Sequence, residues 1–277
     1  AFKLTRLTGR TKIVAMEGAF HGRTMGALAL TYTPKYREPF APLPGDVVFV
    51  PYGDVDALRA EVDGRTAAVV IEPIQGENGV VPAPDGFLAA AREITALAGA
   101  LLWIDEVQTG MGRCGELFLH RASGITADLI TLAKGLGNGF PIGACLAVGP
   151  AAELLQPGQH GTTFGGNPVA AAAGNAVLDA LEAGALVNAR RTGAWLRAQF
   201  EGLAHPQILE VRGAGLLLGV VLASDIAVQV ADAALEAGWI VNAPRPNVLR
   251  VAPPLISTPA DLEGFVALLP GLLDRHG

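Results

Sequence analysis

Residues 128–143 read Asp-Leu-Ile-Thr-Leu-Ala-Lys-Gly-Leu-Gly-Asn-Gly-Phe-Pro-Ile-Gly, an apolar run that ends in a lysine followed by glycines. The run 128–133 predicts a buried strand that carries Lys134 at its end. Of the four lysines in the chain, only Lys134 lies in an apolar setting. Loss of hydration would lower the pKa of its amine and leave it nucleophilic. A lysine whose head group simply reaches solvent from a strand end is the alternative interpretation.

The composition predicts a globular protein with a large core. Hydrophobic residues make up 51% of the 277 residues and charged residues 17%. The net charge of −6 argues against a nucleic-acid partner. Two cysteines cannot form a disulfide framework, so we expect a reducing, cytoplasmic setting. No stretch predicts a membrane span or a signal peptide, and we expect further residues before Ala1, because the chain opens without Met inside an apparent amphipathic helix.

Apolar strands alternate with helices through most of the chain. This pattern predicts an α/β fold whose mostly parallel sheet is flanked by helices on both faces. From about residue 185 onward the pattern changes to short strand pairs and two helices, which predicts a smaller C-terminal α+β domain. We therefore expect a large domain over residues 1–184 and a small domain over residues 185–277. The main predicted strands cover residues 12–17, 46–50, 67–72, 100–105, 128–133, 143–148, 208–212, 215–222, 239–242 and 248–251.

A second chemical signal is the strand 100–105, which ends in Asp105 and is followed by Glu106. An ATPase would show this pattern together with a Gly-x-x-x-x-Gly-Lys-Ser/Thr loop, which the chain lacks. The glycines of residues 135–139 resemble a dinucleotide loop, but Pro141 and a strand replace the helix that such a loop requires. A buried structural aspartate remains the other interpretation of Asp105.

Asp105 and Lys134 make chemical sense together around pyridoxal 5′-phosphate. In enzymes that use this cofactor a lysine amine binds its aldehyde covalently, and an aspartate pairs with its pyridinium nitrogen. The charged ring can then accept the electrons that remain when a substrate C–H bond breaks. We therefore predict that Lys134 and Asp105 are catalytic residues.

Five motifs, in the same order and spread over essentially the whole chain, resemble the class III (ω-amino acid) pyridoxal phosphate-dependent aminotransferases. The resemblance implies the fold type I of pyridoxal phosphate enzymes and an aminotransferase activity. Within the class it is closest to members that act on N-acetylornithine in arginine biosynthesis. The motifs are Phe-His-Gly-Arg-Thr at 20–24, Glu-Pro-Ile-Gln-Gly-Glu at 72–77, Asp-Glu-Val-Gln-Thr-Gly-Met-Gly-Arg at 105–113, Ala-Lys-Gly-Leu-Gly at 133–137 and Gly-Thr-Thr-Phe-Gly-Gly-Asn-Pro at 161–168.

The resemblance implies a set of cofactor contacts. Phe20 would stack on the cofactor ring and Val107 would pack against its opposite face. Gln108 would hydrogen-bond the phenolic oxygen of the ring. Thr163 would reach the cofactor phosphate of a neighbouring subunit, which makes a homodimer the expected assembly. Without the resemblance, core packing or a surface position would explain each of these residues.

The resemblance also implies how the substrates are held. Arg250 would bind the α-carboxylate of the acceptor 2-oxoglutarate, and Arg23 the α-carboxylate of the donor N-acetylornithine, because a guanidinium matches a carboxylate with two hydrogen bonds. Glu77 would pair with Arg250 while the donor is bound and swing aside for the oxo acid. An ordinary ion pair is the alternative for each arginine.

Several possibilities stay open at this point. Ornithine, succinyldiaminopimelate and 4-aminobutyrate are rival donors, and a non-catalytic relic of the fold is a different class of answer. His21 is expected to be structural, and the other histidines form no cluster with metal-ligand spacing, so no metal is predicted. The phosphate-binding turn of the family would lie before Ala1.

Overall fold

The computed structural model describes residues 1–277 and divides into two compact units. Unit 1 comprises Ala1–Pro73, Ala83–Met111 and Phe118–Leu178. Unit 2 comprises Ile74–Pro82, Gly112–Leu117 and Asp179–Gly277. Unit 2 therefore begins near the predicted boundary at residue 185 and also includes two short segments from the first half of the chain.

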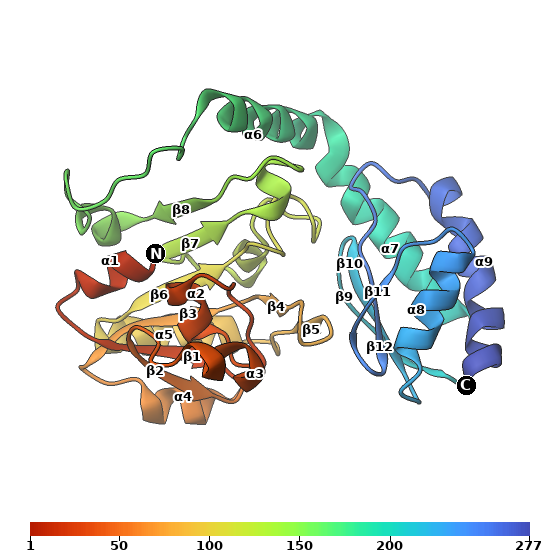
Figure 1. Ribbon diagram of the computed structural model, residues 1–277, viewed down its shortest axis with the longest axis horizontal. Helices are drawn as coiled ribbons and strands as arrows, with labels where there is room; N and C mark the ends of the chain where they lie inside the picture. The colour runs from red at the N-terminus through yellow and green to blue at the C-terminus, as the bar shows by residue number, and fades with distance from the viewer. The chain divides into compact units, whose positions relative to one another are not determined.

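Unit 1 contains a six-stranded sheet with the strand order β2-β1-β3-β6-β7-β8 (Figure 1). The first five strands in this order run parallel to their neighbours, and only β8 pairs antiparallel with β7. All six residues of β3 are buried, as expected for a central strand covered on both faces. The predicted α/β class is confirmed. The strands are β1 (Lys12–Met16), β2 (Asp46–Val50), β3 (Thr66–Ile71), β6 (Leu101–Asp105), β7 (Leu129–Leu132) and β8 (Ala144–Ala147).

The longest helix that lies wholly in unit 1, α5, buries one apolar face. In α5, the residues Phe87, Leu88, Ala91 and Ile94 recur at helical spacing and are all buried, whereas Leu97 is exposed. The helix ends at Gly99, whose φ of 64° is the left-handed conformation that glycine adopts at low cost. The helices are α1 (Phe2–Arg6), α2 (Met25–Leu30), α3 (Pro34–Arg37), α4 (Val55–Glu61), α5 (Phe87–Ala98) and α6 (Pro168–Ala180), the last reaching the edge of unit 2.

Unit 2 is an antiparallel four-stranded sheet, β11-β12-β10-β9, with helices against one face (Figure 1). Leu218, Val220 and Leu222 alternate along β10 and join the core formed with Phe200 and Phe265 of the helices. The two-stranded ribbon β4-β5 also belongs to this unit. The elements are β4 (Ile74–Gln75), β5 (Val81–Pro82), α7 (Leu186–Gly202), β9 (Ile208–Ala214), β10 (Leu217–Leu222), α8 (Ala227–Glu236), β11 (Asn242–Arg245), β12 (Val248–Val251) and α9 (Pro259–His276).

The long helical stretch 168–202 begins and breaks where the sequence indicates. The Asn167 side chain accepts a hydrogen bond from the Ala170 amide at 3.0 Å, and Pro168 takes the first helical position. A π-helical segment, Leu181–Ala185, separates α6 from α7, with Gly184 at φ 128°. By length and composition the stretch could cross a membrane. Its most apolar 18 residues have a mean hydropathy of 1.3, and 17% of them are buried. This is weak support for a span, and the absence of membrane contact stays a prediction.

One strand lies elsewhere than predicted. The sequence predicts a strand at residues 239–242, but β11 occupies Asn242–Arg245. The end of α8 uses the preceding residues, because Gly238 adopts φ 88° and the Trp239 amide donates to the Ala234 carbonyl at 2.8 Å. Pro244 is tolerated in β11 because this is an edge strand, which needs no hydrogen bond on its outer side.

Candidate active site

Four neighbouring strands of the unit 1 sheet deliver polar residues to the same edge. In the order β1-β3-β6-β7, each strand ends at or shortly before a polar or aromatic residue. Functional residues of parallel sheets gather at the carboxyl ends of the strands, and these residues do so here. We call this group the strand-end cluster; it consists of Phe20, His21, Glu72, Asp105 and Lys134.

Asp105 is 5% exposed at the end of β6, and both carboxylate oxygens have partners. Its Oδ1 accepts a hydrogen bond from the Val107 amide at 3.0 Å, and its Oδ2 lies 2.7 Å from Nδ1 of His21. These contacts fix the orientation of the carboxylate. Each oxygen has two lone pairs, so the carboxylate can still accept a hydrogen bond from a ligand N–H.

Glu72 lies next to this pair and is also buried. Its Oε2 accepts a hydrogen bond from the Phe20 amide at 3.1 Å. Burial raises the pKa of Glu72 to about 7, and the charge of Asp105 adds to this effect, whereas His21, the Phe20 amide and Lys134 act in the opposite direction. Burial lowers the pKa of His21, but the hydrogen bond to Asp105 and the charges of Asp105 and Glu72 more than compensate, so its pKa is raised. The cluster is therefore electrostatically coupled.

Lys134 follows β7, directly after the strand residue Leu132 and Ala133. The register pairs Asp105 with Thr131, so the lysine leaves the sheet on the strand next to the aspartate. Lys134 has a φ of 43°, a region that residues other than glycine rarely adopt and that is often found at functional sites. The expectation that Lys134 is shielded from water is wrong for this chain, where the residue is exposed. The reason is local: Lys134 lies beyond the strand, in a glycine-rich turn.

The remaining predicted cofactor residues of unit 1 differ in position. Val107 and Gln108 come after Asp105 and Glu106 in the chain and are half-buried. The Oε1 atom of Gln108 is buried and has no hydrogen-bond partner, which is unusual for a buried polar atom and suits a ligand contact. Thr163 is exposed in the loop before α6 and makes no contact with the strand-end cluster within the chain.

Arg23 lies exposed beside the strand-end cluster. Its guanidinium stacks over the Tyr36 ring at 4.3 Å and lies 5.9 Å from the centre of the Phe20 ring. It forms no ion pair with a carboxylate. A guanidinium held by aromatic rings, with its N–H groups open, is well placed to bind an incoming carboxylate.

Sequence reasoning missed a second buried acid. Glu106 is 1% exposed and its carboxylate accepts hydrogen bonds from the His120 amide and from Nδ1 of His120, both at 2.8 Å, and from the Thr109 hydroxyl. The Glu106 group ties the turn after β6 to residues near 120. The polar pair Asp105-Glu106 at the end of an apolar strand is the only signal that could have indicated it.

The predicted substrate residues Glu77 and Arg250 lie in unit 2 and form an ion pair there. Oε1 of Glu77 is 2.7 Å from a guanidinium nitrogen of Arg250, which also donates to the Gly76 carbonyl at 3.1 Å. The Arg250 side chain is 14% exposed and that of Glu77 40% exposed. The loop that holds Glu77, residues 76–80, joins β4 to β5.

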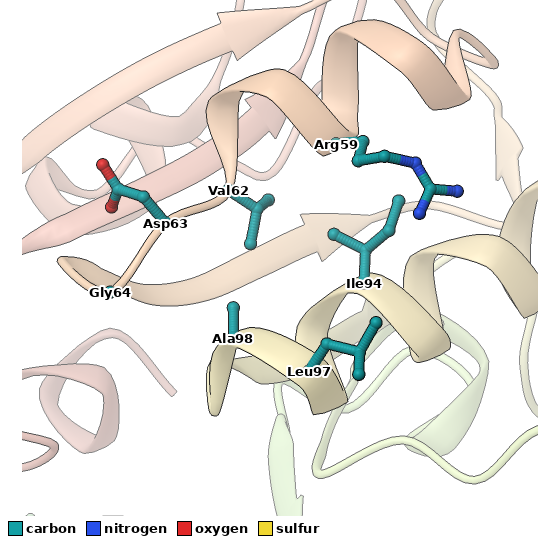
Figure 2. Close-up of a pocket in the computed structure, with 7 residues that line it drawn as sticks. All are labelled: Arg59, Val62, Asp63, Gly64, Ile94, Leu97 and Ala98. Carbon is teal, nitrogen blue, oxygen red and sulfur yellow. The ribbon is translucent and has the colours of Figure 1, made fainter.

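A cavity of about 420 Å³ opens on unit 1 between the ends of α4 and α5 (Figure 2). Both helices lead directly into β3 and β6, so this cavity lies at the amino ends of the strands, opposite the strand-end cluster. None of the predicted site residues lines it. Its lining residues are Arg59, Val62, Asp63, Gly64, Ile94, Leu97 and Ala98.

Comparison with known proteins identifies the family. The model of the family Aminotransferase class-III matches residues 1–271. The chain belongs to the class III aminotransferase family. An acetylornithine aminotransferase from Mycobacterium tuberculosis is 63% identical over 276 residues, which are 99% of this chain and 69% of that protein.

Two solved structures of class III aminotransferases resemble the fold closely. The N-acetylornithine aminotransferase of Stenotrophomonas maltophilia has a TM-score of 0.83 and 34% identity, covering 99% of this chain and 71% of that one. The ornithine aminotransferase of Toxoplasma gondii has a TM-score of 0.91 and 30% identity, covering 99% and 68%, and was crystallised with pyridoxal phosphate at partial occupancy. The predicted fold type and the prediction of a pyridoxal phosphate-dependent aminotransferase are confirmed.

The strand-end cluster suits this cofactor by its own chemistry. A buried, oriented carboxylate at Asp105 can pair with a protonated ring nitrogen, and the unpartnered Oε1 of Gln108 shows that a polar partner is missing there. Nε2 of His21 is likewise buried without a partner.

Proposed function

We propose that the chain transfers the δ-amino group of N-acetylornithine to 2-oxoglutarate and produces glutamate, as a step of arginine biosynthesis. The observation that carries the proposal is the pairing of β6 and β7 in one register, which brings Asp105 and Lys134 to neighbouring strand ends. When bound, pyridoxal phosphate supplies the aldehyde that accepts the amino group and the ring that accepts electrons from the substrate.

The strand-end cluster would hold and move protons. The Lys134 amine would bind the cofactor covalently until a donor amine displaces it, and would then remove the proton from the δ-carbon of the donor. Asp105, fixed by His21 and by the Val107 amide, would keep the ring nitrogen charged. Phe20 and Val107 would hold the two ring faces, and Gln108 would donate to the phenolic oxygen.

The arginines would select the substrates by their carboxylates. Arg23, which has no carboxylate partner, would bind the α-carboxylate of N-acetylornithine. Arg250 would bind the α-carboxylate of 2-oxoglutarate after Glu77 releases it. The exposure of Glu77 supports this exchange, because its side chain is 40% exposed and its carboxylate can be solvated when it leaves Arg250.

The choice of donor rests on sequence similarity. The 63% identity to the acetylornithine aminotransferase of Mycobacterium tuberculosis is well above the 30% identity to the ornithine aminotransferase of Toxoplasma gondii. Among the solved structures, however, that ornithine aminotransferase has a higher TM-score than the N-acetylornithine aminotransferase of Stenotrophomonas maltophilia, 0.91 against 0.83. Fold similarity alone does not distinguish donors. A steady-state comparison of N-acetylornithine, ornithine, succinyldiaminopimelate and 4-aminobutyrate tests the proposal. We expect the highest kcat/KM for N-acetylornithine; a higher value for 4-aminobutyrate would contradict it.

The covalent role of Lys134 has a direct test. Borohydride reduction of the cofactor-loaded protein, followed by peptide mass mapping, should place a pyridoxyl group on Lys134. A label on another lysine would refute the assignment. A protein that stays colourless after addition of the cofactor would instead support the non-catalytic relic, which the retained Asp105–His21 and Glu106–His120 contacts disfavour.

We further propose a cytoplasmic homodimer, with no nucleic-acid or membrane partner. Thr163 lies exposed, as a residue that serves a neighbouring subunit must, and two large apolar side chains close to it in the sequence are also exposed: Phe164 is 82% and Val169 60% exposed. Light scattering on the eluted protein tests this proposal. A monomer that is active at all concentrations would contradict it.

A further inference from the structure

The loop 76–80 of unit 2 is fixed to the sheet by three arginines from three different strands. Arg212 of β9 donates two hydrogen bonds to the Gly79 carbonyl, at 2.8 and 3.0 Å. Arg245 of β11 donates to Oδ1 of Asn78. Arg250 of β12 donates to the Gly76 carbonyl and pairs with Glu77. Every residue from Gly76 to Gly79 thus has an arginine partner.

Packing brings the loop close to the backbone of the sheet. Gly219 of β10 lies between Arg212 and Arg250 in the cross-strand register. A side-chain carbon at Gly219 would lie 3.0 Å from Cβ of Val80 and 3.1 Å from the Gly79 carbonyl oxygen. Val80 itself is fully buried at a φ of 56°. The backbone of the loop is therefore held closely by the sheet, on the face opposite the core of unit 2.

The two neighbours of Glu77 in the loop, Gly76 and Asn78, are held more firmly than the Glu77 side chain. The Gly76 carbonyl and the Asn78 side chain are bound by partly buried arginines, and Nδ2 of Asn78 also donates to Oε1 of Gln75 at 2.8 Å. The side chain of Glu77 is bound only through its half-exposed carboxylate. Arg245 has no carboxylate partner and is committed to the neutral Asn78 amide. The structure thus fixes the backbone and leaves one side chain able to move.

We propose that Asn78 and Arg245 are positioning residues that set how strongly Glu77 competes with a substrate dicarboxylate for Arg250. By fixing the backbone next to Glu77, the Asn78–Arg245 bond reduces the conformational entropy that the Glu77–Arg250 pair would otherwise lose when it forms. Asn78 and Arg245 would then influence how the protein distinguishes a monocarboxylate donor from a dicarboxylate acceptor, although they contact neither substrate. This inference rests on the proposed exchange at Arg250.

The test is the binding of glutarate, an unreactive dicarboxylate, to the full-length, cofactor-loaded protein. Asn78→Ala removes the acceptor of Arg245 without changing the charge of the loop. We expect the Kd of glutarate, measured by calorimetry, to fall about fivefold, because a hydrogen bond from a charged donor contributes enough to account for a change of this size. The inhibition constant of glutarate against the donor half-reaction should fall by a similar factor. The kcat of the variant should stay within about twofold of the wild-type value, because Asn78 would act only through the Glu77–Arg250 pair.

Two variants serve as matched controls. Asn78→Asp keeps an oxygen acceptor for Arg245, and its Kd for glutarate should therefore stay close to that of the wild type. Asn247→Ala removes an asparagine of the same unit that contacts only the Leu222 carbonyl, and should leave the Kd unchanged. If Asn78→Ala does not fold, as judged by its Tm, Asn78→Ser replaces it with the same expectation.

An unchanged or higher Kd in Asn78→Ala, or an equal fall in Asn78→Asp, would overturn the proposal. Failure of the proposed function is distinguishable from this result, because it would appear in the wild-type protein as a lack of activity with N-acetylornithine. Glutarate binding by calorimetry requires no donor, so the effect of Asn78 can be read in either case.

Discussion

The acidic side chains at the strand ends of unit 1 and the acidic side chain in the loop 76–80 of unit 2 differ in how far they are exposed to solvent. Asp105, Glu72 and Glu106 are at most 6% exposed, and their side chains accept hydrogen bonds from residues of unit 1. In unit 2 the Glu77 side chain is 40% exposed, although its partner Arg250 is only 14% exposed. Removing one partner of a buried charged pair costs about 3–5 kcal/mol, whereas an exposed pair contributes about 1 kcal/mol or less.

The difference corresponds to two chemical tasks. In the proposed scheme, Asp105 must keep one orientation toward the ring nitrogen between turnovers, and burial with two hydrogen-bond partners provides this. In the proposed scheme, alternation between two substrates requires a contact that opens and closes, and the 40% exposed side chain of Glu77 would allow this at Arg250. Substitutions in the two regions should therefore have different kinetic signatures.

Substitution of Lys134 should have the largest effect and should stop both half-reactions. Lys134→Ala removes the amine that, in the proposed scheme, binds the cofactor and moves the proton, and we expect a decrease in kcat of about 10³-fold or more. Single-turnover measurements with N-acetylornithine and with 2-oxoglutarate check this. Lys35→Ala, at an exposed lysine of α3, is the control and should retain full activity. A Lys134→Ala protein with a normal rate in either half-reaction would remove Lys134 from the catalytic site.

Substitution of Arg250 should separate the two half-reactions. Arg250→Ala removes the guanidinium that would bind the α-carboxylate of 2-oxoglutarate. We expect kcat/KM for 2-oxoglutarate to fall about 100-fold, because truncating one partner of a hydrogen-bonded charge pair in a binding site costs about 2–5 kcal/mol. The value for N-acetylornithine should change much less, since Arg23 binds the donor in the proposed scheme. Equal losses for both substrates would contradict the division of roles between Arg23 and Arg250.

Several features of both regions could be predicted from the sequence. The apolar strands that end in Asp105 and precede Lys134 predict their own positions, because strand ends of a parallel sheet meet at one edge. The contacts of Glu72, and those of Arg245 with Asn78, could not be predicted. The Glu72–Phe20 and Asn78–Arg245 hydrogen bonds join residues that are 52 and 167 positions apart, and a local sequence pattern does not show such contacts. The exposure of Lys134 was missed because an apolar strand says nothing about what covers the loop after it.

The buried carboxylate of Glu106 should contribute to the stability of unit 1. Glu106→Gln would remove the charge that accepts the hydrogen bonds of His120 and Thr109, and should lower the free energy of unfolding by about 3 kcal/mol. Glu116→Gln is the matched control, because Glu116 pairs with Arg190 at the surface of unit 2, and should cost less than about 1 kcal/mol. Urea denaturation of both variants measures the difference. Equal losses would mean that burial does not distinguish the two acids.

The smallest effect concerns Glu72 and appears as a pH dependence of stability. Its pKa is raised from the ordinary 4.5 to about 7, chiefly by burial, so the folded protein binds this proton more tightly than the unfolded chain. The stabilisation is complete below pH 4.5 and is lost as the pH rises through 7, which amounts to about 2–3 kcal/mol. His21, whose pKa is also raised, acts in the same direction.

Glu72→Gln cannot ionise and should therefore show a flatter stability profile than the wild type between pH 5 and pH 8. Urea denaturation of both proteins in the cofactor-free form, at several pH values across this range, measures the difference. We expect the wild type to lose about 2 kcal/mol more than the variant as the pH rises. Parallel profiles would show that Glu72 is ionised at neutral pH despite its burial. Unit 1 would then tolerate an unneutralised buried acid, and the contrast with the solvated Glu77 of unit 2 would lose its electrostatic basis.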